Sequence, residues 1–149
     1  MRSGREARMI PAMTTRTFRA KLNERAGDML VLAPGGTAYE LSFVAGDEVD
    51  AEAGERVTGY VEANALAIHP ATAGGRFIEP IQGQPRIVAG RVVEVDRDGG
   101  RVLLESVVPM TLNVHSHADM AHCVERCESG EFVNCHVESG STFVPSRDG

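Results

Sequence analysis

The stretch RIVAGRVVEVDRDGGRVLLESVVPM, residues 86–110, carries the clearest fold signal in the chain. Two runs rich in β-branched residues are joined by DRDGG, whose Asp-Gly-Gly at 98–100 tolerates the positive φ of a tight hairpin. Both faces of 87–95 and 102–108 carry apolar side chains, which is typical of strands in a closed barrel. Gly90 predicts a bend or a close approach of another backbone. The stretch therefore predicts a closed β-structure.

Shorter strands are expected on both sides of this hairpin. Apolar and polar residues alternate at 17–24 and 38–44, which indicates half-buried strands. The run MLVLA at 29–33 forms a hairpin with the first of these. The run at 56–68 begins as a strand and then loses its alternation, as a bulged or strongly coiled strand does. A short final strand is expected near 140–144.

One helix is expected near the C-terminus, over residues 117–129. Ser116 and Asp119 form a variant of the capping box, and Gly130 suits the end of the helix. The apolar residues between them have helical spacing and share one stripe. These residues are Met120, Cys123, Val124 and Cys127. The predicted fold is all-β: a small antiparallel barrel of about six strands, of the oligonucleotide/oligosaccharide-binding (OB) kind, with this one helix and the short final strand.

Length and composition predict one domain over residues 15–144, because 149 residues suffice for one sizeable core. Residues 1–14 are expected to be a disordered basic tail, and 145–149 a polar tail. Whether the chain starts at Met1 or Met13 is open at this level.

Charge and hydropathy narrow the classes of partner and compartment. The net charge is −6 and the arginines are scattered, so a nucleic-acid partner is not expected. No apolar run is long enough for a membrane span, and no secretory signal is evident. The odd count of three cysteines argues against a complete disulfide framework and favours the cytoplasm.

The segment HSHADMAHCVERCESGEFVNCH, residues 115–136, holds four of the five histidines and all three cysteines. The helical stripe turns Cys123 and Cys127 toward the core, which favours buried thiols that pack as small hydrophobic groups. In the strand expected at 131–137, Cys135 and His136 point to opposite faces. Core thiols are therefore the preferred interpretation.

A zinc site is the alternative for the same segment. Its ligands would be Cys123, Cys127 and Cys135, with His122, His115 or His117 as the fourth. The spacing C-x3-C-x7-C departs from the usual zinc-ligand spacings, although an i,i+4 pair on a helix can chelate a metal. Zinc is the one cofactor that the sequence suggests.

The segment HPATAGGRFIEPIQGQP, residues 69–85, is expected to be an ordered loop with one short strand. Backbone groups near Arg76 could hold an anion, and Phe77 could stack on a base. The candidate ligand-binding residues are His69, Arg76, Phe77 and Glu79. Alternatively, Phe77, Ile78 and Ile81 close one end of the barrel, while Arg76 and Glu79 pair or stay in water.

Three stretches, AGGRFIEPIQGQPRIVAGRVVEVD (73–96), KLNERAGDMLVL (21–32) and ESGSTF (138–143), resemble a group of uncharacterised small bacterial proteins of planctomycete type. The resemblance covers most of residues 15–143. It implies a compact bacterial domain and assigns no activity and no functional residue.

The expected function is a non-enzymatic binding or assembly module that contacts a protein or a small-molecule ligand through the loop at 69–85. Two alternatives remain open: a zinc-binding protein that uses the cysteines, and a single-stranded nucleic-acid binder, which an OB-like barrel would permit. No nucleophile motif gives positive evidence for catalysis, so whether the protein is an enzyme stays open.

Overall fold

The computed structural model describes residues 16–71, 74–114 and 127–146, and these residues form strands, turns and loops without a helix. The predicted all-β class is confirmed. The strands are β2 (Phe18–Ala26), β3 (Met29–Pro34), β4 (Glu40–Ala45), β5 (Arg56–Pro70), β6 (Phe77–Glu79), β7 (Gln82–Gly83), β8 (Ile87–Asp96), β9 (Arg101–Glu105), β10 (Pro109–Val114), β11 (Phe132–Val137) and β12 (Thr142–Pro145). The tail predicted at 1–14 lies outside the described residues.

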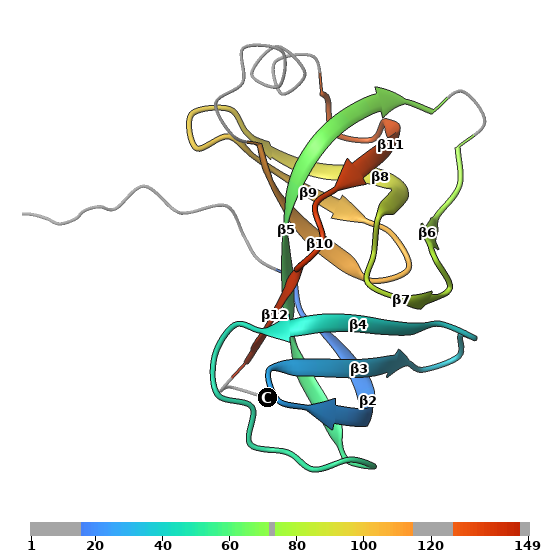
Figure 1. Ribbon diagram of the computed structural model, residues 1–149. Helices are drawn as coiled ribbons and strands as arrows, with labels where there is room; N and C mark the ends of the chain where they lie inside the picture. The colour runs from blue at the N-terminus through green and yellow to red at the C-terminus, as the bar shows by residue number, and fades with distance from the viewer. Residues whose placement is uncertain (1–15, 72–73, 115–126, 147–149) are drawn as a thin grey trace, which may run out of the picture.

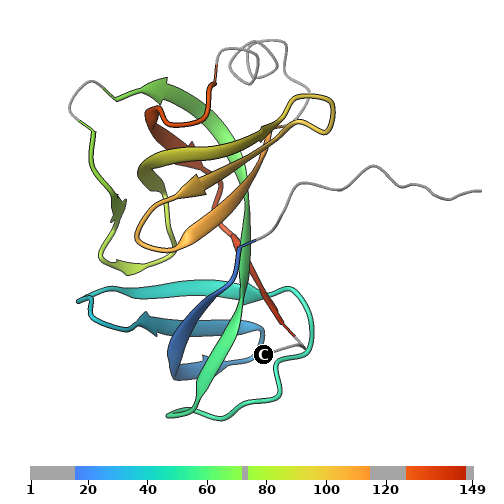
Figure 2. The ribbon, with the colours of Figure 1, turned by 180° about the vertical axis from the view of Figure 1, so that it is seen from behind.

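The strands form one mixed sheet that closes on itself twice, and β5 belongs to both closures (Figure 1). In the first ring, β5 pairs with β2 and β12, and β3 and β4 complete the circuit. In the second ring, β5 pairs with β10 and β11, and β8 and β9 complete the circuit. Figure 2 shows the rings from behind as two lobes, with β5 running through both.

The single antiparallel barrel of about six strands is therefore not what the structure shows. Over the described residues the sheet contains eleven strands, and the pairings of β10 with β5, β12 with β4 and β4 with β7 are parallel. A count of local strand signals misses this arrangement, because one long strand takes part in two circuits.

β5 spans both rings because it is 15 residues long. Its side chains alternate between core and surface from Val57 to Ala65. Leu66 is then inserted as an extra residue, since Val137 of β11 pairs with Ala65 while His136 pairs with Ala67. Leu66 is 55% exposed. The bulge expected within 56–68 is thus confirmed.

The buried apolar residues form one continuous cluster that fills both rings. The strands of the first ring contribute Leu22, Leu30, Leu32, Leu41, Phe43 and Phe143. Those of the second ring contribute Val88, Val92, Val102, Leu104, Met110, Leu112, Val133 and Cys135. Since the cluster is continuous, the two rings share one hydrophobic core.

The hairpin between β8 and β9 has the predicted form. Residues 97–100 connect the strands, and Gly100 has a φ of 66°. Gly90 shows the expected close approach of another backbone, because an ideal Cβ there would lie 2.3 Å from the carbonyl oxygen of Glu105. The glycine thus lets β9 and its turn pass close to β8.

Most of the helix predicted at 117–129 lies outside the described residues. Its last three residues, 127–129, are described, and they form a coil and turn rather than a helix. The prediction was wrong for them: the backbone N–H of Glu131 donates to the carbonyl of Glu128 at 3.2 Å and closes a turn, and the backbone N–H of Gly130 donates to the carbonyl of Val92 at 2.7 Å. Among the described residues, no helix is long and apolar enough to span a membrane.

Candidate functional site

The segment at residues 74–86, called here the bridging loop, connects the two rings at one side of the molecule (Figure 1). Its strand β6 pairs with β8 of the second ring, and its strand β7 pairs with β4 of the first ring. The sequence predicts one short strand in this region, and the structure contains two. The described part of the expected loop at 69–85 contacts both halves of the fold, and its first two residues, His69 and Pro70, belong to β5 instead.

Hydrogen bonds hold the bridging loop on the first ring. The backbone N–H of Glu40 donates to the carbonyl of Ile81 at 3.0 Å. The Glu40 carboxylate accepts bonds from Gln82 Nε2 at 3.0 Å and from Asn23 Nδ2 at 2.8 Å. The Tyr39 hydroxyl accepts a bond from the backbone N–H of Ile78 at 3.3 Å. Glu40 and Tyr39 thus fix the loop from one end of β4.

The second ring and the β11–β12 connection hold the loop as well. The backbone N–H of Val137 in β11 donates to the carbonyl of Arg86 at 2.9 Å. Gln84 Oε1 accepts a bond from the backbone N–H of Gly140 at 2.8 Å. The side chain of Ile78 is 1% exposed and anchors β6 in the core. The exposed residues of the loop are therefore presented on a fixed backbone.

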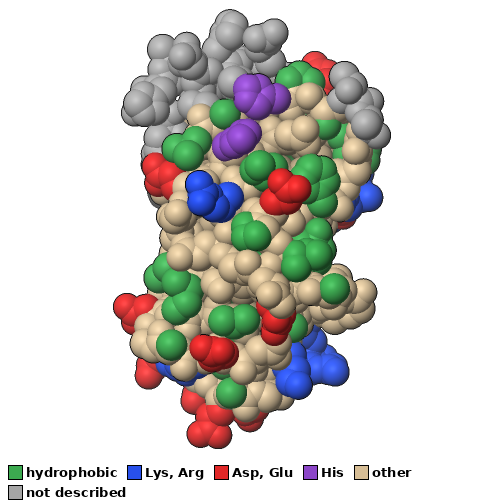
Figure 3. Space-filling view, turned by 45° about the vertical axis from the view of Figure 1, so that its right-hand side comes forward, with side chains coloured by type: hydrophobic (Ala, Val, Ile, Leu, Met, Phe, Trp, Pro, Cys, Tyr) green, Lys and Arg blue, Asp and Glu red, His purple; other side chains and the backbone are tan. Residues whose placement is uncertain are grey.

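The bridging loop carries exposed apolar side chains. Phe77 is 36% exposed and Ile81 is 52% exposed. They border a shallow cavity of about 430 Å³, called here the loop cavity. Its lining consists of Tyr39, Phe77, Ile78, Glu79, Pro80 and Ile81. Hydrophobic side chains lie beside carboxylates on the face shown in Figure 3.

The structure divides the four predicted ligand-binding residues between separate places. Phe77 and Glu79 lie together at the loop cavity. Arg76 instead forms an ion pair with Glu105 at 2.8 Å, and its guanidinium lies 5.6 Å from the ring centroid of Phe132. His69 is at the exposed end of β5 and does not line the cavity. Only two of the four residues therefore share one site.

The alternative of an apolar plug holds for one residue of the three. Ile78 is buried, as a plug requires, but Phe77 and Ile81 remain exposed. Phe77 alternates with the buried Ile78 along the short outer strand β6 and so faces solvent, and Ile81 lies in the bend between β6 and β7. The partner of Arg76 is Glu105 rather than Glu79.

Three arginines that are far apart in sequence surround one carboxylate. Glu105 lies 2.8 Å from Arg76, 3.4 Å from Arg16 and 3.9 Å from Arg91. All four side chains are partly exposed. This arginine cluster carries a local surplus of positive charge that the scattered arginines of the sequence do not reveal.

In the described part of the Cys/His segment, the cysteines are packed in the hydrophobic core rather than grouped as metal ligands. Cys127 is 4% exposed and Cys135 is 0% exposed, and both belong to the hydrophobic cluster. His136 points to the opposite face from Cys135, as expected, and its ring lies 6.2 Å from that of His69. The described residues contain no group of three or more potential metal ligands.

The remaining candidate zinc ligands, Cys123, His122, His115 and His117, lie outside the described residues. The zinc site therefore stays a prediction.

Comparisons with known proteins add no further assignment. No family model matches the chain, and no curated protein and no solved structure matches it either.

Sequence reasoning missed Tyr39 as part of the loop cavity. The alternation of AYELSFV assigns Tyr39 to the inner face with Leu41 and Phe43, and it does pack partly against the core. Its hydroxyl nevertheless reaches the bridging loop. A tyrosine at the start of a strand is a weak signal for such a role, because its polar end needs a hydrogen-bond partner.

Proposed function

We propose that this protein is a non-enzymatic binding module that holds a segment of a partner protein at the loop cavity. The observation that carries the proposal is the exposure of Phe77 and Ile81 on a loop that is bonded to both rings. Exposed aromatic and aliphatic side chains beside a shallow cavity are the usual anchors of a protein interface. A fixed backbone reduces the entropy that binding would cost.

The chemistry of the cavity indicates the kind of segment that fits. Its lining is mostly apolar, and its one ionisable carboxylate is Glu79. Glu79 is exposed at the end of β6. An apolar peptide segment with a neighbouring lysine or arginine would complement both features. We place this activity in the cytoplasm of a bacterium, in keeping with the three cysteines and the resemblance drawn from the sequence.

A peptide display selection on the immobilised protein tests the proposal. We expect it to enrich apolar peptides with a basic residue, and Ile81→Ser should weaken their binding about tenfold or more. Leu66→Ser is the matched control, since Leu66 is 55% exposed and lies on β5 outside the loop cavity. Failure to enrich any peptide, or equal loss in both variants, would overturn the proposal.

A nucleic-acid partner has one observation in its favour, the arginine cluster around Glu105. Each guanidinium there lies within 4 Å of the same carboxylate, so part of the positive charge is compensated within the protein. We propose it only as the second function. A titration with a labelled single-stranded oligonucleotide at low salt tests it, and saturable binding that weakens with salt would support it.

A further inference from the structure

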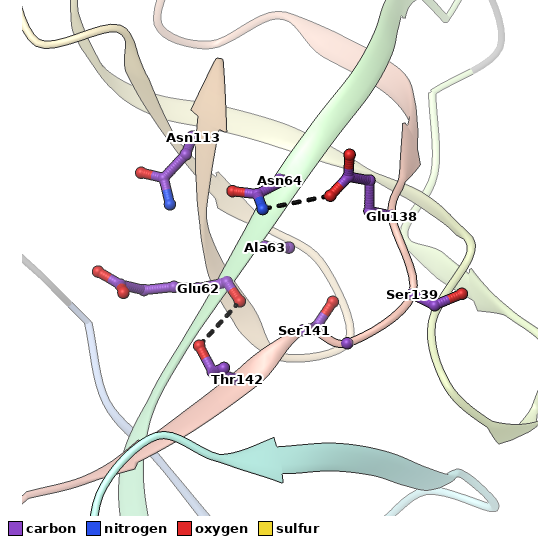
Figure 4. Close-up of a pocket in the computed structure, with 9 residues that line it drawn as sticks. Glu62, Ala63, Asn64, Asn113, Glu138, Ser139, Ser141 and Thr142 are labelled. Atoms are coloured by element: carbon purple, nitrogen blue, oxygen red, sulfur yellow. Dashed lines mark hydrogen bonds between the residues drawn. The ribbon is translucent and has the colours of Figure 1, made fainter. Parts of the chain in front are cut away.

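A second cavity lies where the two rings meet, and we call it the junction pocket (Figure 4). It encloses about 210 Å³. The side chains used in the argument below are Glu62, Asn64, Asn113, Glu138, Ser141 and Thr142. They come from β5, β10, β12 and the β11–β12 connection, so both rings contribute.

The fold places these side chains together through the pairing of β5. Asn113 of β10 is the register partner of Asn64, and Thr142 of β12 is the partner of Glu62. The backbone N–H of Glu138 donates to the carbonyl of Asn64 at 2.9 Å, which holds the β11–β12 connection beside β5. The polar residues of β5 that alternate with its core residues thus face one pocket.

Within the described part of the chain, Ser141 is the one residue whose buried side-chain oxygen has no hydrogen-bond partner. It is 4% exposed, and its Oγ has no hydrogen-bond partner among the described residues. Figure 4 shows the hydroxyl pointing into the pocket, toward the side of Asn64 and Glu138. A buried hydroxyl that makes no hydrogen bond is unfavourable, so this position is suited to a polar group of a ligand.

The charges of the lining determine the class of ligand. The lining includes the acidic residues Glu62 and Glu138, and among the residues that the structure describes it includes no lysine, arginine or histidine. An anion would be repelled by the two carboxylates, whereas a cation would be attracted by both. The side chains of Glu62 and Glu138 lie at opposite ends of the pocket in Figure 4. They therefore do not converge on one centre, as the oxygen ligands of a hard metal ion must.

We propose that the junction pocket binds a small organic cation that carries two primary amino groups. Each ammonium group has three hydrogen-bond donors and no acceptor, which matches a lining rich in acceptor oxygens. One ammonium group pairs with Glu138 and donates to Ser141 Oγ. The other pairs with Glu62 at the opposite end of the pocket. Asn64 Nδ2 already donates to Glu138 Oε2 at 3.3 Å, which leaves the amide oxygen of Asn64, like that of Asn113, as a further acceptor for the ligand (Figure 4).

The probe for this proposal is 1,4-diaminobutane, titrated into the full chain by calorimetry at low salt. We expect saturable binding that weakens as salt rises. Glu62→Gln and Glu138→Gln should each lower the affinity about tenfold, because each removes one charge-assisted contact. Ser141→Ala should lower it by a smaller factor. Glu24→Gln is the matched control, since Glu24 is exposed on β2 and does not line the pocket.

Three outcomes would overturn the proposal. The first is the absence of saturable binding to the unaltered protein at about 10 mM probe, which excludes even a weak complex. The second is butylamine binding as tightly as the diamine, or Glu24→Gln weakening the binding as much as the pocket variants do. The third is that the diamine does not bind in the pocket but a metal ion, added as calcium chloride, or a neutral sugar, methyl glucoside, does.

The result remains interpretable if a variant does not fold. The diamine is then added to the unaltered protein, and the amide chemical shifts of residues 62–64 and 138–142 should change. Changes confined to other residues would show that the diamine binds outside the junction pocket. The proposal does not rest on the proposed function. Ile81→Ser should leave diamine binding unchanged, so the two can fail separately.

Discussion

Phe143 of β12 lies directly against Gly59 of β5, at the point where the two strands pair in the first ring. An ideal Cβ on residue 59 would be 2.5 Å from Phe143 Cζ and 2.3 Å from the carbonyl oxygen of Val144. Phe143 is fully buried and packs edge-on against Phe18 with ring centroids 5.8 Å apart. The absence of a side chain at Gly59 therefore allows an aromatic pair to fill this part of the core.

Gly59→Ala should lower the free energy of unfolding by about 3 kcal/mol, because the added methyl group meets a backbone oxygen that cannot move alone. Chemical denaturation measures the change. Gly35→Ala is the control, since a Cβ there meets nothing within 4 Å. Equal stability of the two variants would contradict the packing described for Gly59.

The strand positions were largely predictable from the sequence, because alternation with a period of two is a local signal. The inward residues of β2 and β4, such as Leu22, Leu41 and Phe43, are fully buried as expected. The bulge at Leu66 and the close approach at Gly90 were also visible as local irregularities. β10 was missed because it lies next to the run that forms β9.

The double closure and the junction pocket were not predictable in this way, whereas the loop at 69–85 was expected to be a binding site from its residues, two of which line the loop cavity. The pairing of β5 with four other strands depends on residues far away in the sequence, so the local sequence of β5 does not indicate it. For Phe77 the sequence left two roles open, a ligand-binding residue or part of an apolar plug with Ile81, and the structure leaves both side chains exposed. The junction pocket depends equally on distant segments, since Asn64 and Ser141 meet only after both rings close.

Glu40→Ala should loosen the bridging loop without unfolding the protein. The change removes the carboxylate that accepts bonds from Gln82 and Asn23. Of these two bonds the one from Gln82 holds the loop and contributes about 1 kcal/mol, so backbone amides of β6 and β7 should exchange with solvent about fivefold faster. Hydrogen exchange measures this, with Glu24→Ala as the control. Faster exchange throughout the chain would show that Glu40 stabilises the whole fold instead.

Glu105→Gln should destabilise the protein in a salt-dependent manner. The carboxylate is close to the guanidinium groups of Arg16, Arg76 and Arg91, and its removal leaves them to repel one another. All these groups are partly exposed, so we expect a loss of about 1 kcal/mol or less at low salt. The loss should shrink as salt rises. Denaturation at two salt concentrations checks this, and a salt-independent loss would indicate a packing effect.

Cys135→Ala distinguishes a core thiol from a zinc ligand. Cys135 is fully buried in β11, between Val88 of β8 and Ile68 of β5. If the thiol serves packing, its removal should cost about 1 kcal/mol, because only a small cavity is left. The metal content, measured by elemental analysis of protein purified without added metal, should then be the same in both proteins. If the unaltered protein instead contains stoichiometric zinc and the variant contains none, Cys135 is a zinc ligand. The reason is that a site with four ligands binds zinc much more weakly once one thiolate is removed.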